Sequence, residues 1–232
     1  MTWLVEVATC PSTSTWAIDH LSELRHGEVV FTRLQTAGRG REGRVWLAPT
    51  GTLTFSVVLD LVGVDQRAVA LAAGLACIHA IADLMPGLDP HLTIKWPNDV
   101  LLSHRKVAGI LCEAASGRLV VGIGLNRSAD LPKSLAATSL HGHGQPPEEI
   151  ALLAAIRRYL LEAVGLLAAR GLAPLLPQLR VRDVLLGRSV SVESRTGQLH
   201  GTGAGIDEHG HLLLIVAAGG IAEVDAGHIT AW

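Results

Sequence analysis

The segment from His91 to Asn126 constrains the fold more than any other part of the chain. Four apolar, strand-like stretches follow one another there, and the breaks between them are only a few residues long. Parallel neighbours need a crossover of a dozen or more residues, so strands this close in sequence are expected to pair antiparallel. A regular alternation of strands and helices is therefore disfavoured. The four predicted strands are His91–Trp96, Val100–Leu102, Val107–Cys112 and Leu119–Leu125.

Long helices are expected on both sides of this segment. Asp65 can cap an alanine-rich helix that stops at Pro86, and a second helix is expected from Pro147 to Arg170. The most apolar stretch, Ala68–Ile78, has eleven residues, fewer than the roughly 20 of a membrane span, so it predicts a buried helix. The combination predicts an α+β fold with a mixed or antiparallel central sheet and flanking helices. Further strands are predicted at Leu4–Ala8, Val29–Leu34 and Thr52–Leu61, and further helices at Trp16–Leu24 and in the segment that contains Pro174 and Pro177 and ends near Leu185.

The pattern changes near Leu186, after which only short strands are expected. Four or five short strands within about 45 residues are typical of a small β-barrel of the SH3 type. We therefore divide the chain into a ligand-binding domain, residues 1–185, and a C-terminal SH3-like barrel, residues 186–232. The predicted strands are Ser189–Glu193, Leu199–Ile206, Leu212–Val216 and Ile221–Val224, with turns at Thr196-Gly197, His209-Gly210 and Gly219-Gly220.

Composition excludes several classes of protein. Apolar residues make up 49% of the chain and charged residues 17%, which indicates a buried core rather than disorder. The formal net charge is −2, so extensive binding of nucleic acid is not expected. The three cysteines, Cys10, Cys77 and Cys112, form no C-x-x-C pair, which favours a reducing compartment over a disulfide framework. The N-terminus lacks the basic region followed by an apolar stretch that is typical of a signal peptide, so we expect a cytoplasmic protein.

A glycine- and arginine-rich loop, Gly38–Arg44, is the most informative candidate site. Its three glycines leave the backbone free to approach a ligand, and its three arginines suit phosphate or carboxylate. Mutual repulsion of the arginines predicts a loop that is mobile until an anion binds. The loop matches G-x-G-x-x-G, but Val45–Gly51 does not read as the helix that a dinucleotide fold requires. A solvated surface loop is the alternative interpretation.

Lys106 is a second candidate, because it begins an apolar strand close to Gly109. A partly desolvated lysine there could neutralise charge that develops on a carboxyl or phosphoryl oxygen. The alternative is a hairpin-end lysine in water. Asn98 and Asp99, which follow Pro97, could simply form an Asx turn.

Gly122 and Gly124 leave one face of a strand without side chains. Such a face admits a flat ligand or a closely packed backbone. His141 and His143 are read as part of a surface loop rather than as metal ligands, since no cysteine or carboxylate cluster accompanies them.

Taken in order, five segments resemble the biotin protein ligase family. Ser12–Ser14 is similar to the family's S-T-N. The loop resembles Q-x-x-G-R-G-R-x-G-R-x-W, and three further segments resemble K-W-P-N-D, K-x-x-G-I-L-x-E and G-x-G-x-N. The order and spacing make the resemblance specific, and it covers essentially the whole chain. The last four segments are Gln35–Trp46, Lys95–Asp99, Lys106–Glu113 and Gly122–Asn126.

The resemblance implies ATP-dependent biotinylation of one lysine on the biotin carrier domain of a carboxylase, through biotinoyl-5′-AMP. It also implies a catalytic domain like that of class II synthetases, Mg²⁺ carried by the ATP phosphates with no assigned protein ligand, and a possible homodimer. The implied catalytic residues are Lys106 and Arg41. The implied biotin site is Ser12, Thr13, Ser14, Gln35, Gly38, Arg39, Gly40, Arg41, Lys106, Gly109, Leu111 and Gly124, with the biotin tail along the strands at Gly109–Leu111 and Gly122–Gly124. The implied ATP site is Arg39, Arg41, Arg44, Trp46, Asn98, Lys106 and Asn126.

The sequence departs from the family pattern at two positions. Ser14 replaces an asparagine, and Glu42 introduces an acid that could pair with a neighbouring arginine. Eleven residues precede Ser12, too few for a helix-turn-helix, so a ligase without DNA binding is expected. The main alternative is a lipoate or octanoate ligase or transferase of related fold. A non-catalytic binder of biotin or nucleotide, and an RNA-binding loop, are further alternatives.

Overall fold

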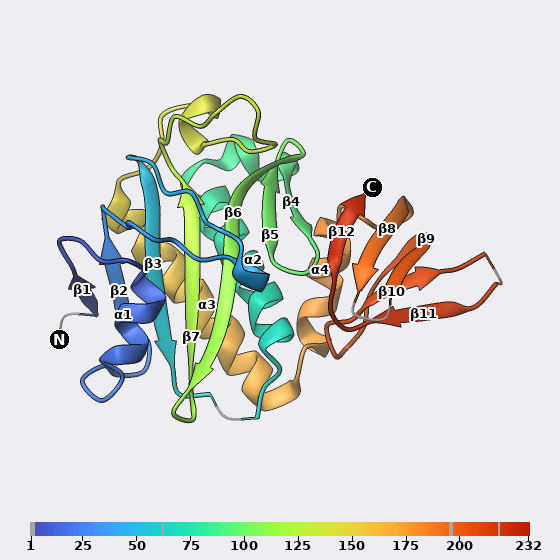
Figure 1. Ribbon diagram of the computed structural model, residues 1–232, viewed down its shortest axis with the longest axis horizontal. Helices are drawn as coiled ribbons and strands as arrows, with labels where there is room; N and C mark the ends of the chain where they lie inside the picture. Colours follow the sequence, from blue (N-terminus) through green and yellow to red (C-terminus); the bar gives the residue numbers. More distant parts are fainter. Residues whose placement is uncertain (1–2, 62, 195–196, 218) are drawn as a thin grey trace.

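The computed structural model describes residues 3–61, 63–194, 197–217 and 219–232, and their strands form two sheets (Figure 1). The central sheet has the order β1-β2-β3-β7-β6-β5-β4. Every neighbouring pair in it is antiparallel except β1 and β2, so the sheet is mixed. The antiparallel run predicted between His91 and Asn126 is confirmed. The strands are β1 (Leu4–Glu6), β2 (Val29–Thr32), β3 (Thr52–Leu59), β4 (Leu92–Lys95), β5 (Asp99–Leu102), β6 (Arg105–Ala115) and β7 (Arg118–Asn126).

Alternating residues of the central strands face two different hydrophobic clusters. Val29 and Val57 belong to the main core with the two long helices, α2 (Gln66–Leu84) and α3 (Glu149–Arg170). Val30 and Val58 belong instead to a smaller cluster with Ala17 of α1 (Thr13–Asp19). Because side chains alternate across a strand, α1 covers the opposite face from α2 and α3 (Figure 1).

Helix α2 is the buried helix that the sequence predicted. Asp65 caps it, with a carboxylate oxygen 2.8 Å from the amide nitrogen of Arg67. Among the described residues, α2 is the one helix that is long and apolar enough to cross a membrane. However, 72% of its apolar stretch is buried inside this fold. It packs against α3 and against the central sheet, and most of its alanines are buried there. Helix α3 ends at Gly171, as predicted.

Helix α1 lies earlier in the chain than the predicted Trp16–Leu24. It begins at Thr13 because the Ser12 hydroxyl accepts from the amide of Thr15 and caps the first turn. The buried hydroxyls of Thr13 and Ser14 both bond Ser56, which removes the usual cost of polar groups in a buried turn. The polar start of the segment is therefore part of the helix rather than a preceding loop.

The C-terminal segment forms a second, antiparallel sheet of order β11-β10-β9-β8-β12. Strands β11 and β12 are its two edges, and no pairing between them is found in the part of the chain that the structure describes. Strand β12 was not delimited from the sequence, and Thr196 of the predicted turn lies outside the described residues. The elements are the 3₁₀ turn η4 (Ala173–Leu175), α4 (Leu176–Arg182), β8 (Ser189–Ser194), β9 (Gly197–Ile206), β10 (Leu212–Ile215), β11 (Ile221–Val224) and β12 (His228–Ala231).

The two sheets are packed against each other. The indole nitrogen of Trp96 donates to the carbonyl of Gly210 at 2.9 Å, and the amide of Val184 donates to Ile94 at 3.0 Å. Val192 of β8 and Leu212 of β10 belong to the same hydrophobic cluster as the central sheet. The C-terminal sheet is thus held firmly beside β4 and α4 (Figure 1).

Candidate active site

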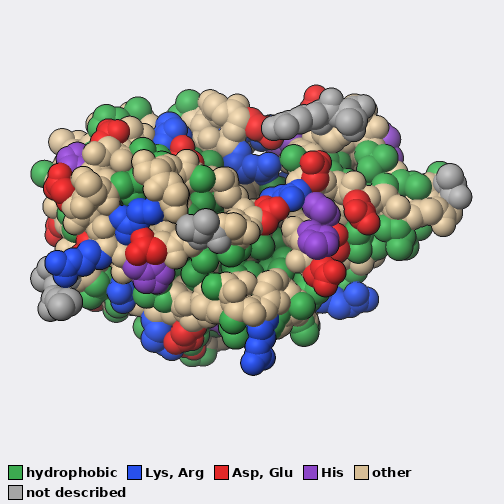
Figure 2. Space-filling model, turned by 90° about the horizontal axis from the view of Figure 1, so that it is seen from below, with side chains coloured by type: hydrophobic (Ala, Val, Ile, Leu, Met, Phe, Trp, Pro, Cys, Tyr) green, Lys and Arg blue, Asp and Glu red, His purple; other side chains and the backbone are tan. Residues whose placement is uncertain are grey.

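The five motif segments converge on one open cleft. Its floor is the middle of β6 and β7, and its walls come from α1, residues 35–46, residues 95–99 and β12. Figure 2 shows Lys and Arg side chains gathered at a hollow in one face of the molecule, with acidic and histidine side chains beside them. The predicted site residues that line the cleft are Ser12, Thr13, Ser14, Gln35, Arg39, Gly40, Arg41, Arg44, Trp46, Asn98, Lys106, Gly109, Leu111 and Gly124.

Two predicted site residues do not line the cleft. A Cβ atom at Gly38 would collide with the carbonyl oxygen of Trp46, so this glycine is required by close packing within the loop. Asn126 is 97% buried, and its amide nitrogen lies 3.5 Å from the carbonyl of Lys106. Its side-chain oxygen has no partner among the described residues, a rare state for a buried polar atom.

The wall that α1 provides is polar and buried. The Gln35 side-chain oxygen accepts from the amide of Thr13 at 3.0 Å. Ser56 links the Thr13 and Ser14 hydroxyls, at 2.8 and 3.0 Å. Gly122 faces this group, because a Cβ there would strike the Ser14 hydroxyl. Sequence reasoning did not single out Ser56, although a serine inside the apolar run of β3 is an available signal for a buried polar contact.

The glycine face of β6 and β7 is covered by the indole of Trp46. A Cβ on Gly124 would lie 2.5 Å from the indole nitrogen, and one on Gly109 would lie 3.1 Å from the far edge of the ring. In this conformation, the flat group that lies on the glycine face is therefore the indole of Trp46. The indole nitrogen of Trp46 is buried and has no hydrogen-bond partner in the part of the chain that the structure describes. A ligand tail cannot occupy the same face while the indole lies there.

Each arginine of the loop has an acidic neighbour. Arg39 contacts Glu113 of β6 at 2.7 Å, and Glu42 lies 3.8 Å from Arg41 and 3.9 Å from Arg44. The strong mutual repulsion expected from the sequence is therefore relieved, and the predicted pairing of Glu42 with its neighbours is confirmed. Glu42 adopts a left-handed backbone, φ 57°, inside a single 3₁₀ turn. Burial lowers the pKa of Arg41, and the carboxylates of Glu42 and Asp99 partly offset this.

Lys106 is a fixed residue rather than a loose hairpin end. Its backbone bonds Ala136 and Thr138 at 3.0 and 2.9 Å, and its Nζ lies 2.6 Å from Asp99 Oδ1. Asp99 thus does more than form a turn. The side-chain amide of Asn98 donates to the carbonyl of Ile110 at 2.7 Å and holds strand β6 in place.

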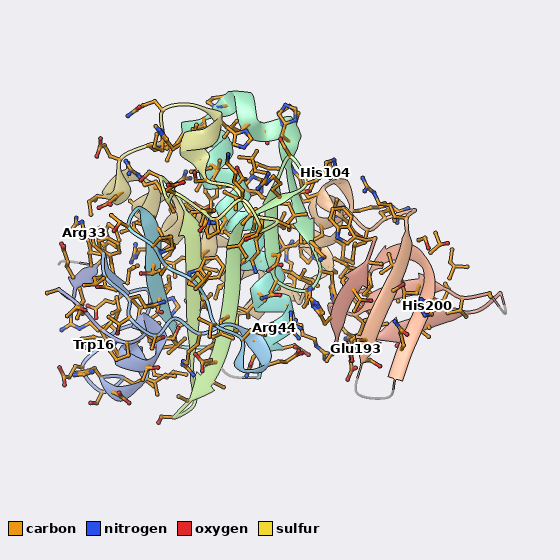
Figure 3. The ribbon with its side chains drawn as sticks, turned by 45° about the horizontal axis from the view of Figure 1, so that its top comes forward. Trp16, Arg33, Arg44, His104, Glu193 and His200 are labelled. Atoms are coloured by element: carbon orange, nitrogen blue, oxygen red, sulfur yellow. The ribbon has the colours of Figure 1, made fainter. Side chains whose placement is uncertain are left out.

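Two basic residues in the cleft were missing from the predicted site. Lys95 ends β4 and lines the cleft; burial, with the charges of Lys106 and Arg44, lowers the pKa of its amine. His228 of β12 reaches the cleft from the C-terminal sheet, and its Nδ1 lies 3.1 Å from Nη1 of Arg44. Burial first, then Arg44 and Lys95, lowers the pKa of His228. Figure 3 shows Arg44 between the central sheet and the C-terminal sheet.

The cleft combines a strongly cationic half with a neutral polar half. Its carboxylates within the described residues are Glu42 and Asp99, and Asp99 is already paired with Lys106. Such an arrangement suits a ligand, or two ligands, with negative charge at one end and hydrogen-bonding groups at the other.

Comparison with known proteins finds similar chains. Residues 5–128 match the model of the "Biotin/lipoate A/B protein ligase family". The chain is 36% identical to the biotin–acetyl-CoA-carboxylase ligase of Paracoccus denitrificans, over 92% of this chain and 94% of that protein. It is also 36% identical to the ligase of the same name from Mycobacterium tuberculosis, over 88% of this chain and 78% of that protein. The match to the bifunctional ligase/repressor BirA of Escherichia coli, 31% identical, spans 88% of this chain and 66% of that protein.

Solved structures agree with the sequence comparisons. The biotin protein ligase from Aquifex aeolicus, solved in complex with biotin and ATP, superposes with a TM-score of 0.87 at 26% identity. The superposition covers 98% of this chain and 97% of the other.

Proposed function

This chain belongs to the biotin/lipoate A/B protein ligase family, and on that premise we propose that it joins biotin, at the expense of ATP, to a lysine of a biotin carrier domain. The observation that carries the proposal is that three loop arginines and Lys106 line one cleft. The opposite wall of this cleft consists of buried hydroxyl groups and a side-chain amide. Relatives named as biotin–acetyl-CoA-carboxylase ligases match this chain over most of their own length.

The chemistry of the first step explains why the cleft is cationic. The carboxylate of biotin attacks the α-phosphorus of ATP, an acyl–phosphate bond forms, and pyrophosphate leaves. Both reactants are anions, so their repulsion must be cancelled and charge on the transferring phosphoryl group must be stabilised. Lys106 is the cation fixed most firmly at the floor, and Arg39, Arg41 and Arg44 supply the charge above it.

In the second step the amine of the carrier lysine attacks the acyl carbon, and AMP leaves with the phosphoryl oxygen. The mixed anhydride is sensitive to water, so it must be shielded until the carrier arrives. The arginine loop is the element that could close over the adenylate, and Gly40 lies on it beside Arg41.

The neutral half of the cleft is the proposed place for the ureido head of biotin. Thr13, Ser14 and Gln35 offer donors and acceptors there, already ordered through Ser56. Because Ser14 is shorter than asparagine, its hydroxyl fits between Ser56 and Gly122. The biotin tail would run along Gly109 and Gly124, which requires the indole of Trp46 to move away.

The triphosphate would lie at the cationic mouth. Arg44 lines it, and the indole nitrogen of Trp46, which has no partner among the described residues, is a candidate contact for the adenosine. Asn126 does not line the cleft and would contact the adenosine only after a local rearrangement. Mg²⁺ bound to the phosphates fits this site only loosely, since Glu42 and Asp99 are the lining carboxylates among the described residues. Most of its ligands would then come from phosphate and water.

We further propose that residues 186–232 form a C-terminal domain of SH3-like barrel type, which packs against residues 1–185 as the catalytic domain. The antiparallel order of five short strands supports this. A register shift in β12, between Ile229 and Ala231, would help the sheet to curve.

The test of the function is direct. The protein is incubated with biotin, MgATP and a purified biotin carrier domain, and the carrier is analysed by intact mass. We expect one biotinyl group on one lysine, with pyrophosphate released. A carrier in which that lysine is replaced by arginine is the control. Transfer of lipoate in preference to biotin, or binding without pyrophosphate release, would contradict the proposal.

A further inference from the structure

His228 joins the arginine loop to the C-terminal sheet. Its ring nitrogens lie 3.1 and 3.4 Å from Nη1 of Arg44, a residue 184 positions earlier in the chain. The neighbouring Gly227 and Ile229 also line the cleft, so the start of β12 forms one of its walls. The C-terminal sheet therefore takes part in the site rather than lying beside it.

Charged groups surround this histidine from four elements. Arg44 and Glu42 face it from the loop, Lys95 from β4 and Asp99 from β5. Glu193 is its register partner on β8 and is exposed. Burial and the two cations outweigh the carboxylates, so the pKa of the ring is lowered.

A neutral ring nitrogen can accept the N–H of Arg44, whereas a protonated ring has two N–H donors and no acceptor. The protonation state of His228 thus decides whether it holds Arg44 or turns toward an anion. A triphosphate between Arg44, Lys95 and His228 would bring several negative charges next to the ring. Those charges would offset the two cations and favour the protonated form.

We propose that His228 is a positioning residue for the nucleotide: it holds Arg44 at the mouth of the empty cleft and takes up a proton as the triphosphate of ATP binds. This inference rests on the proposed function, because it assigns a role to one residue of the same site. Nucleotide affinity is then highest at low pH and falls as the pH rises through the ring's pKa in the complex. Each unit by which binding raises that pKa changes the affinity by up to about tenfold.

The experiment is calorimetric titration of the whole protein, with biotin present, by the Mg²⁺ complex of α,β-methylene-ATP. This analogue cannot undergo cleavage between its α- and β-phosphorus atoms, so binding is separated from the reaction. Titrations from about pH 6 to about pH 8 in buffers of different ionisation enthalpy give the number of protons bound. The variants are His228→Gln, which can still accept from Arg44 but cannot titrate, and His228→Ala, which can do neither.

A matched control is His200→Gln. His200 lies on β9 of the same sheet, bonds Ser191 at 2.8 Å and does not line the cleft (Figure 3). We expect wild type and His200→Gln to take up protons on binding, His228→Gln to take up fewer and to lose the pH dependence, and His228→Ala to bind several-fold more weakly at every pH. Thermal unfolding of each variant checks that the fold is kept.

Two results would overturn the inference alone. One is equal proton uptake by wild type and His228→Gln, and the other is unchanged affinity in His228→Ala. Failure of the wild-type protein to bind the analogue at all, or to release pyrophosphate from biotin and MgATP, would instead overturn the proposed function and the inference with it. The two failures are therefore distinguishable.

Discussion

The Nζ of Lys106 lies 2.6 Å from Oδ1 of Asp99 and 5.3 Å from the centre of the Trp46 ring. Both members of the ion pair are partly exposed, so the pair contributes only about 0–1 kcal/mol to the free energy of unfolding. Its importance lies in placement, because it keeps the ammonium group over the floor of the cleft. An incoming carboxylate or phosphoryl oxygen would compete with Asp99 for it.

Replacing Lys106 by alanine should therefore impair chemistry more than folding. We expect pyrophosphate release from biotin and MgATP to fall by about 10²–10³-fold, the range seen when one group that stabilises developing charge is removed. The melting temperature should change little. Lys133→Ala, which removes an exposed lysine outside the cleft, is the control. Near-normal pyrophosphate release by Lys106→Ala would count against the assignment.

Replacing Arg41 by glycine should let the adenylate escape. Arg41 is the loop arginine with the least exposed side chain, 30%, and it faces the cleft, so its loss removes charge and contact over the intermediate. After reaction with biotin and radiolabelled ATP, rapid filtration should recover less bound acyl-adenylate than in wild type. The matched control is Lys133→Gly, which removes an exposed cation outside the cleft. Equal retention by Arg41→Gly and wild type would show that the loop does not shield the intermediate.

Replacing Gly124 by alanine should destabilise the protein by about 1–3 kcal/mol, since the new methyl group would overlap the indole of Trp46. Combining it with Trp46→Ala should remove most of that cost, because the colliding ring is gone. Urea unfolding of the four proteins in this double-mutant cycle measures the coupling. Gly165→Ala, on the exposed side of α3 with no atom of the described residues near the added carbon, should be neutral or stabilising. Additive effects of the Gly124 and Trp46 changes would contradict the contact.

Replacing Asp183 by asparagine should stabilise the protein at neutral pH. Burial raises the pKa of Asp183, its Oδ2 has no hydrogen-bond partner within the described ranges, and its Oδ1 accepts from the amide of Leu185. A carboxyl with a raised pKa favours folding in its protonated form. The wild-type contribution is therefore lost as the pH rises from the unfolded pKa through the folded one, and it stays constant above that.

The difference in unfolding free energy between Asp183→Asn and wild type should accordingly be small near pH 4, grow with pH and then level off. Denaturant titrations across this range measure it. Asp130→Asn, at an exposed loop position, is the control. A variant that is less stable than wild type at pH 8 would show that the ionised carboxylate has a partner.

The strand neighbours between His91 and Asn126 were predictable because the breaks between the strands are too short for anything but antiparallel pairing. The start of α2 and the end of α3 were predictable because Asp65 and Gly171 are local start and stop signals. Helix α1 was misplaced for the opposite reason. Its first turn is polar, and it is helical and buried only because Ser56, far along the chain, satisfies its hydroxyls.

For the candidate site, the sequence alone identified half of the described residues that line the cleft, since each of these belongs to a short segment with its own spacing. Only the tertiary structure brought His228 to Arg44, Glu113 to Arg39 and the indole of Trp46 onto Gly124. These contacts link segments up to 184 residues apart, and they depend on how the two sheets and the loop pack together. Local sequence patterns carry information about hydrogen bonds and side-chain alternation within one element. Which charges finally meet across the cleft is decided by the packing of the whole chain.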